Sequence, residues 1–98
     1  MVKHMIIWKL NEQIQDKNQV AKNIKTALEG LEGRIEGLIK MSILTQKLQS
    51  SSGDIMMDSL FEDEKALKAY QSNPLHQEIA NGLVRPNVQT RLSFDFEI

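Results

Sequence analysis

The chain has 98 residues, of which 41% are hydrophobic and 26% are charged, and this composition is typical of a globular protein. Its 12 basic and 13 acidic residues give a formal net charge of −1, so nothing favours a nucleic-acid partner. The absence of cysteine excludes disulfides, and no apolar run approaches the ~20 residues that cross a bilayer. We therefore expect one cytoplasmic domain over residues 1–98, without a membrane or nucleic-acid partner.

The first predicted element is a strand from Val2 to Leu10, because the segment is rich in β-branched and aromatic residues. Side chains on one face of a strand alternate along the sequence. The residues that share one face are Val2, His4, Ile6, Trp8 and Leu10. A helix follows, since Asp16 and Gln19 have the spacing of a capping box and the helical pattern ends at Gly30 and Gly33. Its apolar stripe is Val20, Ile24, Leu28 and Leu31.

A long hairpin occupies the middle of the chain. Its first strand is predicted from Ile35 to Leu48, and its second from Asp54 to Phe61. The polar segment between them has the composition of a flexible loop, which makes an antiparallel pairing the expected arrangement. We expect Ile39, Met41 and Ile43 on one face of the first strand and Leu38 and Leu44 on the other.

Two short helices and a last strand complete the pattern. Asp63 is a suitable N-cap for the first helix, while Asn73 and Pro74 suit the N-cap and first position of the next. That last helix ends at Pro86, and a strand runs from Val88 to Ile98. The inward residues of the two helices are expected to be Ala66, Leu67 and Tyr70 in the first and Leu75, Ile79 and Leu83 in the second.

The order β-α-β-β-α-β predicts an α+β, ferredoxin-like fold with a four-stranded antiparallel sheet of order 4-1-3-2 and helices on one face. Every strand nevertheless carries apolar residues on both faces, including Phe94 and Phe96 in the last strand. An uncovered apolar face of that size is unusual in a monomer. We therefore expect a homodimer, sheet against sheet, that forms a dimeric α/β barrel. Pairing of the first and last strands places His4 near Asp95.

Three segments of the chain resemble a known family. These are VKHMIIWKL at the start, FEDEKALKAYQSNPLHQEI after the hairpin, and FDFEI at the end, together with Pro86. The combination of an early Lys-His, a Y-x3-P-x-H block and a late Asp-Phe is similar to the stress-responsive A/B barrel (Dabb) domain family. The resemblance implies the ferredoxin-like fold and sheet-to-sheet dimers. The family includes plant stress-linked proteins, polyketide cyclases and many bacterial members.

The same resemblance implies roles for four side chains. His76 matches the histidine that acts as the general base in the cyclases, and Tyr70 matches the tyrosine that positions substrate. His4 and Asp95 match residues that line the same pocket. The chain departs from the cyclases at Asn73, where they have a histidine before the proline, and this difference leaves the substrate open.

The residues themselves allow a structural and a functional interpretation. His76 lies in the first turn of a helix, where the positive dipole end favours a neutral imidazole that suits a general base, or it only packs and caps the helix. Tyr70 donates to a substrate carbonyl, or it buries its ring and leaves the hydroxyl in water. His4 and Asp95 form an orienting pair, or a pair that burial alone requires. A 2-His-1-carboxylate metal site has little support from the spacing, and we expect no metal and no cofactor.

The leading hypothesis is a homodimer that binds a small apolar carbonyl or phenolic compound between sheet and helices. Trp8, Met57 and Phe61 are expected to line that cavity. If the protein is an enzyme, it is a cofactor-independent cyclase or lyase with His76 as base and Tyr70 as donor. The alternatives are a ligand-binding or stress-response protein without turnover and, by analogy of fold, a cofactor-free monooxygenase.

Overall fold

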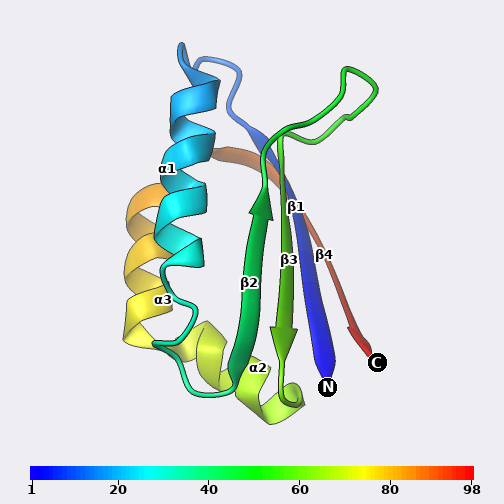
Figure 1. Cartoon of the computed structure of the whole chain (residues 1–98). Coiled ribbons are helices and arrows are strands. Elements are labelled where there is room, and N and C mark those ends of the chain that lie inside the picture. The colour runs from blue at the N-terminus through cyan, green and yellow to red at the C-terminus, as the bar shows by residue number, and fades with distance from the viewer.

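The computed structural model describes residues 1–98, and its elements follow the predicted order (Figure 1). The strands and helices are β1 Val2–Leu10, α1 Lys17–Glu29, β2 Leu38–Leu44, β3 Ile55–Phe61, α2 Glu64–Ser72, α3 Pro74–Ile79 and β4 Val88–Glu97. A π-helical turn, η1 Ala80–Val84, and a 3-10 turn, η2 Arg85–Asn87, connect α3 to β4. The sequence predicted a single helix that ends at Pro86. In the structure α3 ends at Ile79, and a wider π turn and then a tighter 3-10 turn follow it.

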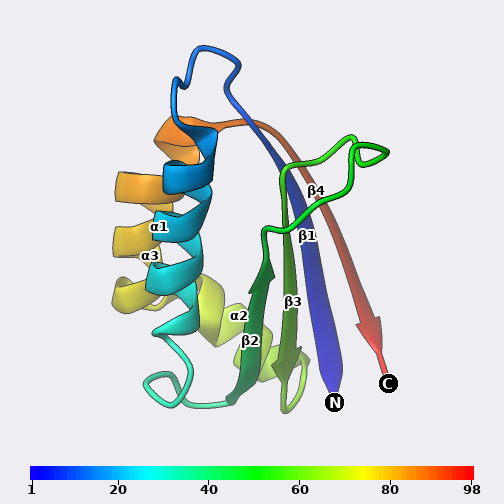
Figure 2. The same cartoon turned by 45° about the horizontal axis from the view of Figure 1, so that its top comes forward.

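The four strands form one antiparallel sheet of order β2-β3-β1-β4, which confirms the predicted ferredoxin-like topology. The helices lie on one side of this sheet and leave the other side bare (Figures 1 and 2). The chain ends lie side by side, where the Ile98 amide donates to the Met1 carbonyl at 3.0 Å. None of the helices combines the length and the hydropathy needed to cross a bilayer.

Side-chain caps begin each of the three helices, as the sequence predicted for Asp16, Asp63 and Asn73. Such a cap contributes about 1 kcal/mol because it satisfies a backbone amide that has no partner inside the helix. The donors are the backbone amides of Gln19 at 3.0 Å, Ala66 at 2.7 Å and Leu75 at 2.9 Å. The Gln19 side chain bonds Asn23 instead of completing a capping box. The caps thus fix where α2 and α3, which carry Tyr70 and His76, begin.

The prediction for β2 was wrong in its length and its faces. The strand spans Leu38–Leu44, and its register against β3 shifts between Leu38 and Lys40. The shift inserts an extra residue, which changes the side on which the following residues lie. Leu38 therefore shares the buried face with Met41 and Ile43, while Ile39 and Leu44 are exposed on the other face.

The buried stripe after Asn73 also differs from the prediction. Leu75, Ile79 and Leu83 are only partly buried, whereas Ala80 and Val84 are buried. A π turn is wider than an α-helical turn, and such turns often occur beside functional sites. In this chain Ala80 and Val84 of the π turn both line the space between the sheet and the helices.

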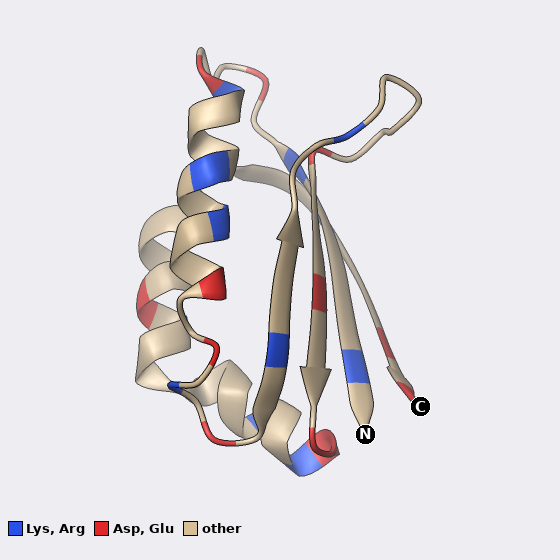
Figure 3. Cartoon of the chain, in the orientation of Figure 1, with Lys and Arg blue, Asp and Glu red and all other residues tan.

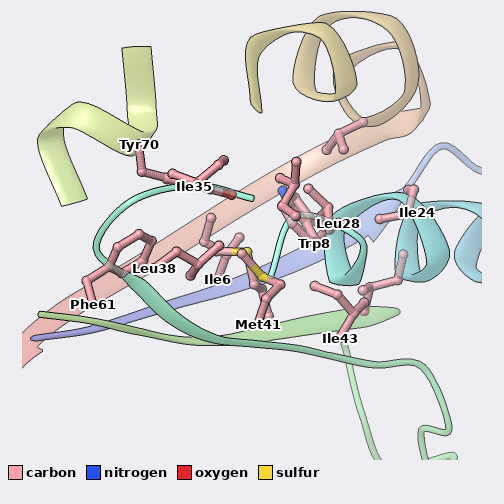
Figure 4. Packing of buried hydrophobic residues seen from close by; sticks show 14 of the residues in the cluster. Ile6, Trp8, Ile24, Leu28, Ile35, Leu38, Met41, Ile43, Phe61 and Tyr70 are labelled. Carbon is pink, nitrogen blue, oxygen red and sulfur yellow. The ribbon is translucent and has the colours of Figure 1, made fainter. Parts of the chain in front are cut away.

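The hydrophobic core lies between the sheet and the helices, where side chains from β1, β2 and β3 meet α1 and α2 (Figure 4). The opposite, outer face of the sheet is also apolar, as predicted, and nothing in the chain covers it. Its exposed residues are Ile7, Ile39, Leu44, Leu92, Phe94 and Phe96. Charged residues of both signs are interspersed over the fold, and the strands are mainly uncharged (Figure 3). Two of the few charged residues on the strands, Lys3 on β1 and Asp58 on β3, form an ion pair with each other.

Two glycines with the same backbone conformation provide a test of the packing that holds α2. Gly33 and Gly37 both have φ 85°, but a Cβ on Gly37 would lie 2.5 Å from the Cβ of Ala66 on α2, whereas Gly33 has open space. Gly33→Ala should lower the free energy of unfolding by about 1 kcal/mol from backbone strain alone. Gly37→Ala should cost a further ~1–3 kcal/mol from overpacking. Urea unfolding at equal protein concentration measures both, and equal losses would contradict the close approach of α2.

Candidate functional site

A cavity of about 590 Å³ lies between the sheet and the helices. Side chains from β1, β3, β4 and all three helices contribute to its wall, together with the turns that follow α3. Five of the residues singled out from the sequence line it, and these are His4, Trp8, Met57, Tyr70 and His76. The tertiary structure therefore brings together both histidines and the single tyrosine of the chain.

His76 is held with one ring nitrogen free. Its Nδ1 lies 3.3 Å from the backbone carbonyl oxygen of Gln71, and because a carbonyl only accepts hydrogen bonds, Nδ1 carries the proton. Nε2 is left with a lone pair. Burial lowers the pKa of His76 below its usual value, the Gln71 carbonyl raises it, and the nearby Arg85, His4 and Arg91 lower it further. The imidazole is thus neutral at pH 7, chiefly through burial, whereas the sequence had pointed to the helix dipole.

Tyr70 has a buried hydroxyl without a hydrogen-bond partner. The residue is 1% exposed, and its ring packs against Phe61 and His76 with centroid separations of 5.0 and 4.2 Å. Burial raises the pKa of the phenol, so the hydroxyl stays protonated and remains a donor. The interpretation that places this hydroxyl in water is therefore wrong. An unsatisfied buried donor costs about 1–3 kcal/mol.

His4 and Asp95 are opposite each other on β1 and β4, and His4 Nδ1 is hydrogen-bonded to the Asp95 carboxylate. The His4 side chain is 3% exposed, while that of Asp95 is 44% exposed. Asp95 does not line the main cavity and faces a neighbouring hollow of about 300 Å³. On the other side of His4, the Ser59 hydroxyl donates to the His4 carbonyl oxygen at 2.7 Å. Asp95 on β4 thus holds the ring of His4, while Ser59 on β3 holds its backbone.

Phe61 does not line the cavity, although the sequence predicted that it would. It is fully buried, and its ring lies behind the site, 5.0 Å from the ring of Tyr70 and 6.4 Å from that of His4. Being the last residue of β3, it is covered by α2 immediately after the chain turns. Phe61 therefore supports the position of Tyr70 without offering a surface to a ligand.

Sequence reasoning missed the polar residues of the cavity wall, which are Gln71, Gln77, Arg85, Gln89 and Arg91. One signal was present, because Arg91, Ser93 and Asp95 alternate with apolar residues along the last strand. That alternation assigns polar side chains to the helix-facing side of β4. No three histidine, aspartate or glutamate side chains lie close enough together to hold a metal ion.

Comparison with known proteins gives one family and many similar folds. The model of the stress responsive A/B barrel domain family (Dabb) matches residues 2–98. No curated protein matches the sequence. A dimeric protein of unknown function with a ferredoxin-like fold from Bacteroides fragilis is 24% identical, with a TM-score of 0.89 over 99% of this chain and 95% of that one.

Two further structures show the range of this fold. A Dabb family protein from Mesorhizobium loti is 18% identical, with a TM-score of 0.75 over 99% of this chain and 95% of that one. The hydroxynitrile lyase from Passiflora edulis is 13% identical, with a TM-score of 0.82 over 99% of this chain and 92% of that one. At these identities the likeness establishes the fold alone.

The unpaired hydroxyl of Tyr70 predicts an unusual stability change. Tyr70→Phe keeps the ring between Phe61 and His76 and removes the buried donor, so it should raise the free energy of unfolding of the ligand-free protein by about 1 kcal/mol. Tyr70→Ala removes the ring as well and should lower it by about 3 kcal/mol. Thermal or urea unfolding measures both. A loss of stability in Tyr70→Phe would mean that the hydroxyl has a partner in the folded protein.

Proposed function

Because the chain belongs to the stress responsive A/B barrel domain family, we propose that it is a cytoplasmic homodimer whose subunits each bind a small apolar carbonyl or phenolic compound. The observation that carries this proposal is the buried, unpartnered hydroxyl of Tyr70 beside the neutral imidazole of His76 in one cavity. A carbonyl or phenolic oxygen of a ligand would accept the hydrogen bond that the protein does not supply. The apolar part of the ligand would lie against Trp8 and Met57.

The same pair of side chains suits proton abstraction next to a carbonyl. Nε2 of His76 removes the α-proton, and the electrons of the C–H bond form an enolate whose oxygen accepts a hydrogen bond from Tyr70. The proton on Nε2 then returns to carbon or oxygen after a bond has formed or broken. This chemistry is of the cyclase or lyase type and uses no cofactor. The existence of a hydroxynitrile lyase with this fold supports such a use of the scaffold.

His4 and Asp95 have a positioning role in this proposal. The Asp95 carboxylate bonds His4 Nδ1, and Ser59 holds the His4 backbone, so the ring presents a fixed edge to the cavity. Asp95 lies outside the main cavity, so in this proposal it acts through His4 and does not contact the ligand. The alternative of binding without turnover keeps the same contacts and differs only in the absence of a chemical step.

The outer face of the sheet supports the homodimer. Its apolar residues include Phe94, which is 69% exposed in the single chain, and such a continuous surface is typical of a contact between subunits. The β2–β3 connection extends beyond the sheet on this outer side (Figures 1 and 2). The cavity lies on the opposite, helix-covered side, so association through the outer face leaves each cavity intact.

Hydrogen exchange at carbon tests the proposed base. Incubation with the neutral ketone propiophenone in D₂O should give deuterium incorporation above the buffer rate, measured by NMR. His76→Gln should lose about 10²–10⁴-fold of the catalysed rate, the usual contribution of a general base. Because burial lowers the pKa of His76 from its usual value, the catalysed rate should rise with pH, reach half of its maximum below pH 6.5 and then level off. Unchanged exchange in His76→Gln would exclude this base, and exchange by the native protein no faster than in buffer would leave binding without turnover. Oxygen uptake with a quinol would favour the monooxygenase.

Sedimentation tests the dimer. The native chain should sediment at micromolar concentration with twice its mass of 11.2 kDa, and Phe94→Asp should shift it to the monomer because a charge then lies in the apolar contact. Ala69→Asp places the same charge on the exposed side of α2 and should leave the dimer unchanged. A native chain that remains an 11.2 kDa species would contradict the sheet-to-sheet association.

A further inference from the structure

The cavity has basic side chains in its wall and no acidic ones. Its ionisable lining residues are His4, Tyr70, His76, Arg85 and Arg91, and no aspartate or glutamate is among them. The guanidinium groups of the two arginines are protonated at any ordinary pH. The chain as a whole is slightly acidic, with a net charge of −1, so this wall differs in sign from the rest of the protein.

Arg91 has no carboxylate partner in the fold. It lies on β4 opposite Trp8, which places it on the helix-facing side of the sheet, and it is absent from all ion pairs of the structure. Most positions on that side of the sheet are apolar and covered by helices. An exposed arginine at the margin of an apolar cavity offers a flat pair of donors that matches the geometry of a carboxylate.

Arg85 adds a second positive charge from the other wall. Its guanidinium donates to the Asn81 side-chain oxygen, which fixes the side chain without neutralising its charge. Both arginines lie near enough to His76 to act on it electrostatically. Neither arginine takes part in an ion pair, and Asp95 is bonded to His4 and faces the neighbouring hollow. The positive charges on the cavity wall are therefore not balanced from within the chain.

We propose that the ligand carries a carboxylate, which Arg91 and Arg85 bind at the cavity margin while its apolar carbonyl or phenolic part reaches Tyr70 and His76. This inference rests on the proposed function and narrows its ligand class to keto acids and phenolic acids. The two arginines orient the ligand from the end opposite to the reacting oxygen. The neutral state of His76 suits this ligand, because proton abstraction then starts from an uncharged base beside an anion that is already neutralised.

Matched acids and amides test the proposal. The probes are 4-oxo-4-phenylbutanoate with 4-oxo-4-phenylbutanamide, and 4-hydroxybenzoate with 4-hydroxybenzamide, since each pair differs in charge but hardly in shape. Titration followed by NMR should give an affinity at least about fivefold higher for the acid in each pair, and added salt should reduce this preference. Arg91→Gln should remove most of the preference, and Arg85→Gln a smaller part.

The third arginine of the chain is the control. Arg34 is exposed in the turn after α1 and does not line the cavity, so Arg34→Gln changes the net charge equally and should keep the full preference. Equal binding of acid and amide, or a preference that survives in Arg91→Gln, would overturn the carboxylate site and leave the proposed function intact. If neither member of either pair shifts resonances of Tyr70 or His76, both the carboxylate site and the proposed carbonyl or phenol site are wrong.

Discussion

The register of β1 is the constraint on which the rest of the structure depends. This strand is hydrogen-bonded on both sides, to β3 and to β4, so one alignment fixes three strands at once. It places Ser59, His4 and Asp95 abreast on the helix-facing side of the sheet. A shift of one residue would send His4 to the outer face and the outer apolar residues into the core. The same alternation that builds the core therefore also builds the site.

The site retains an energetic cost that the fold does not remove. The Tyr70 hydroxyl is buried without a partner, although its ring contributes to the core through Phe61. Such unsatisfied groups are rare in folded proteins, and a catalytic role is one of the explanations for them. The Tyr70 hydroxyl thus lowers the stability of the fold but is the donor that the proposed function needs. A phenylalanine at this position would be more stable and would lack that donor.

Local signals were sufficient for the element order. The caps at Asp16, Asp63 and Asn73 were readable because a capping side chain and its amide lie within three residues of each other. The pairing of His4 with Asp95 also followed, because the topology fixes which strands are neighbours. The sequence did not predict which side chains of β2 lie on which face. The register shift beside Lys40 arises from the pairing with β3, and the sequence of β2 alone does not indicate it. The same applies to the wider turn after Ile79, which exchanged Leu83 for Val84 in the buried stripe.

By itself, the sequence determined the ferredoxin-like fold, the bare apolar face and the candidate pair of His76 and Tyr70, because periodicity, caps and a family motif are all local properties of the chain. Only the tertiary structure decided which side chains share the cavity. It excluded Phe61, moved Asp95 to a neighbouring hollow, and added Arg85 and Arg91. It also showed that the hydroxyl of Tyr70 has no partner. These are properties of space between elements distant in sequence, and no spacing along the chain encodes the distance between α2, α3 and β4.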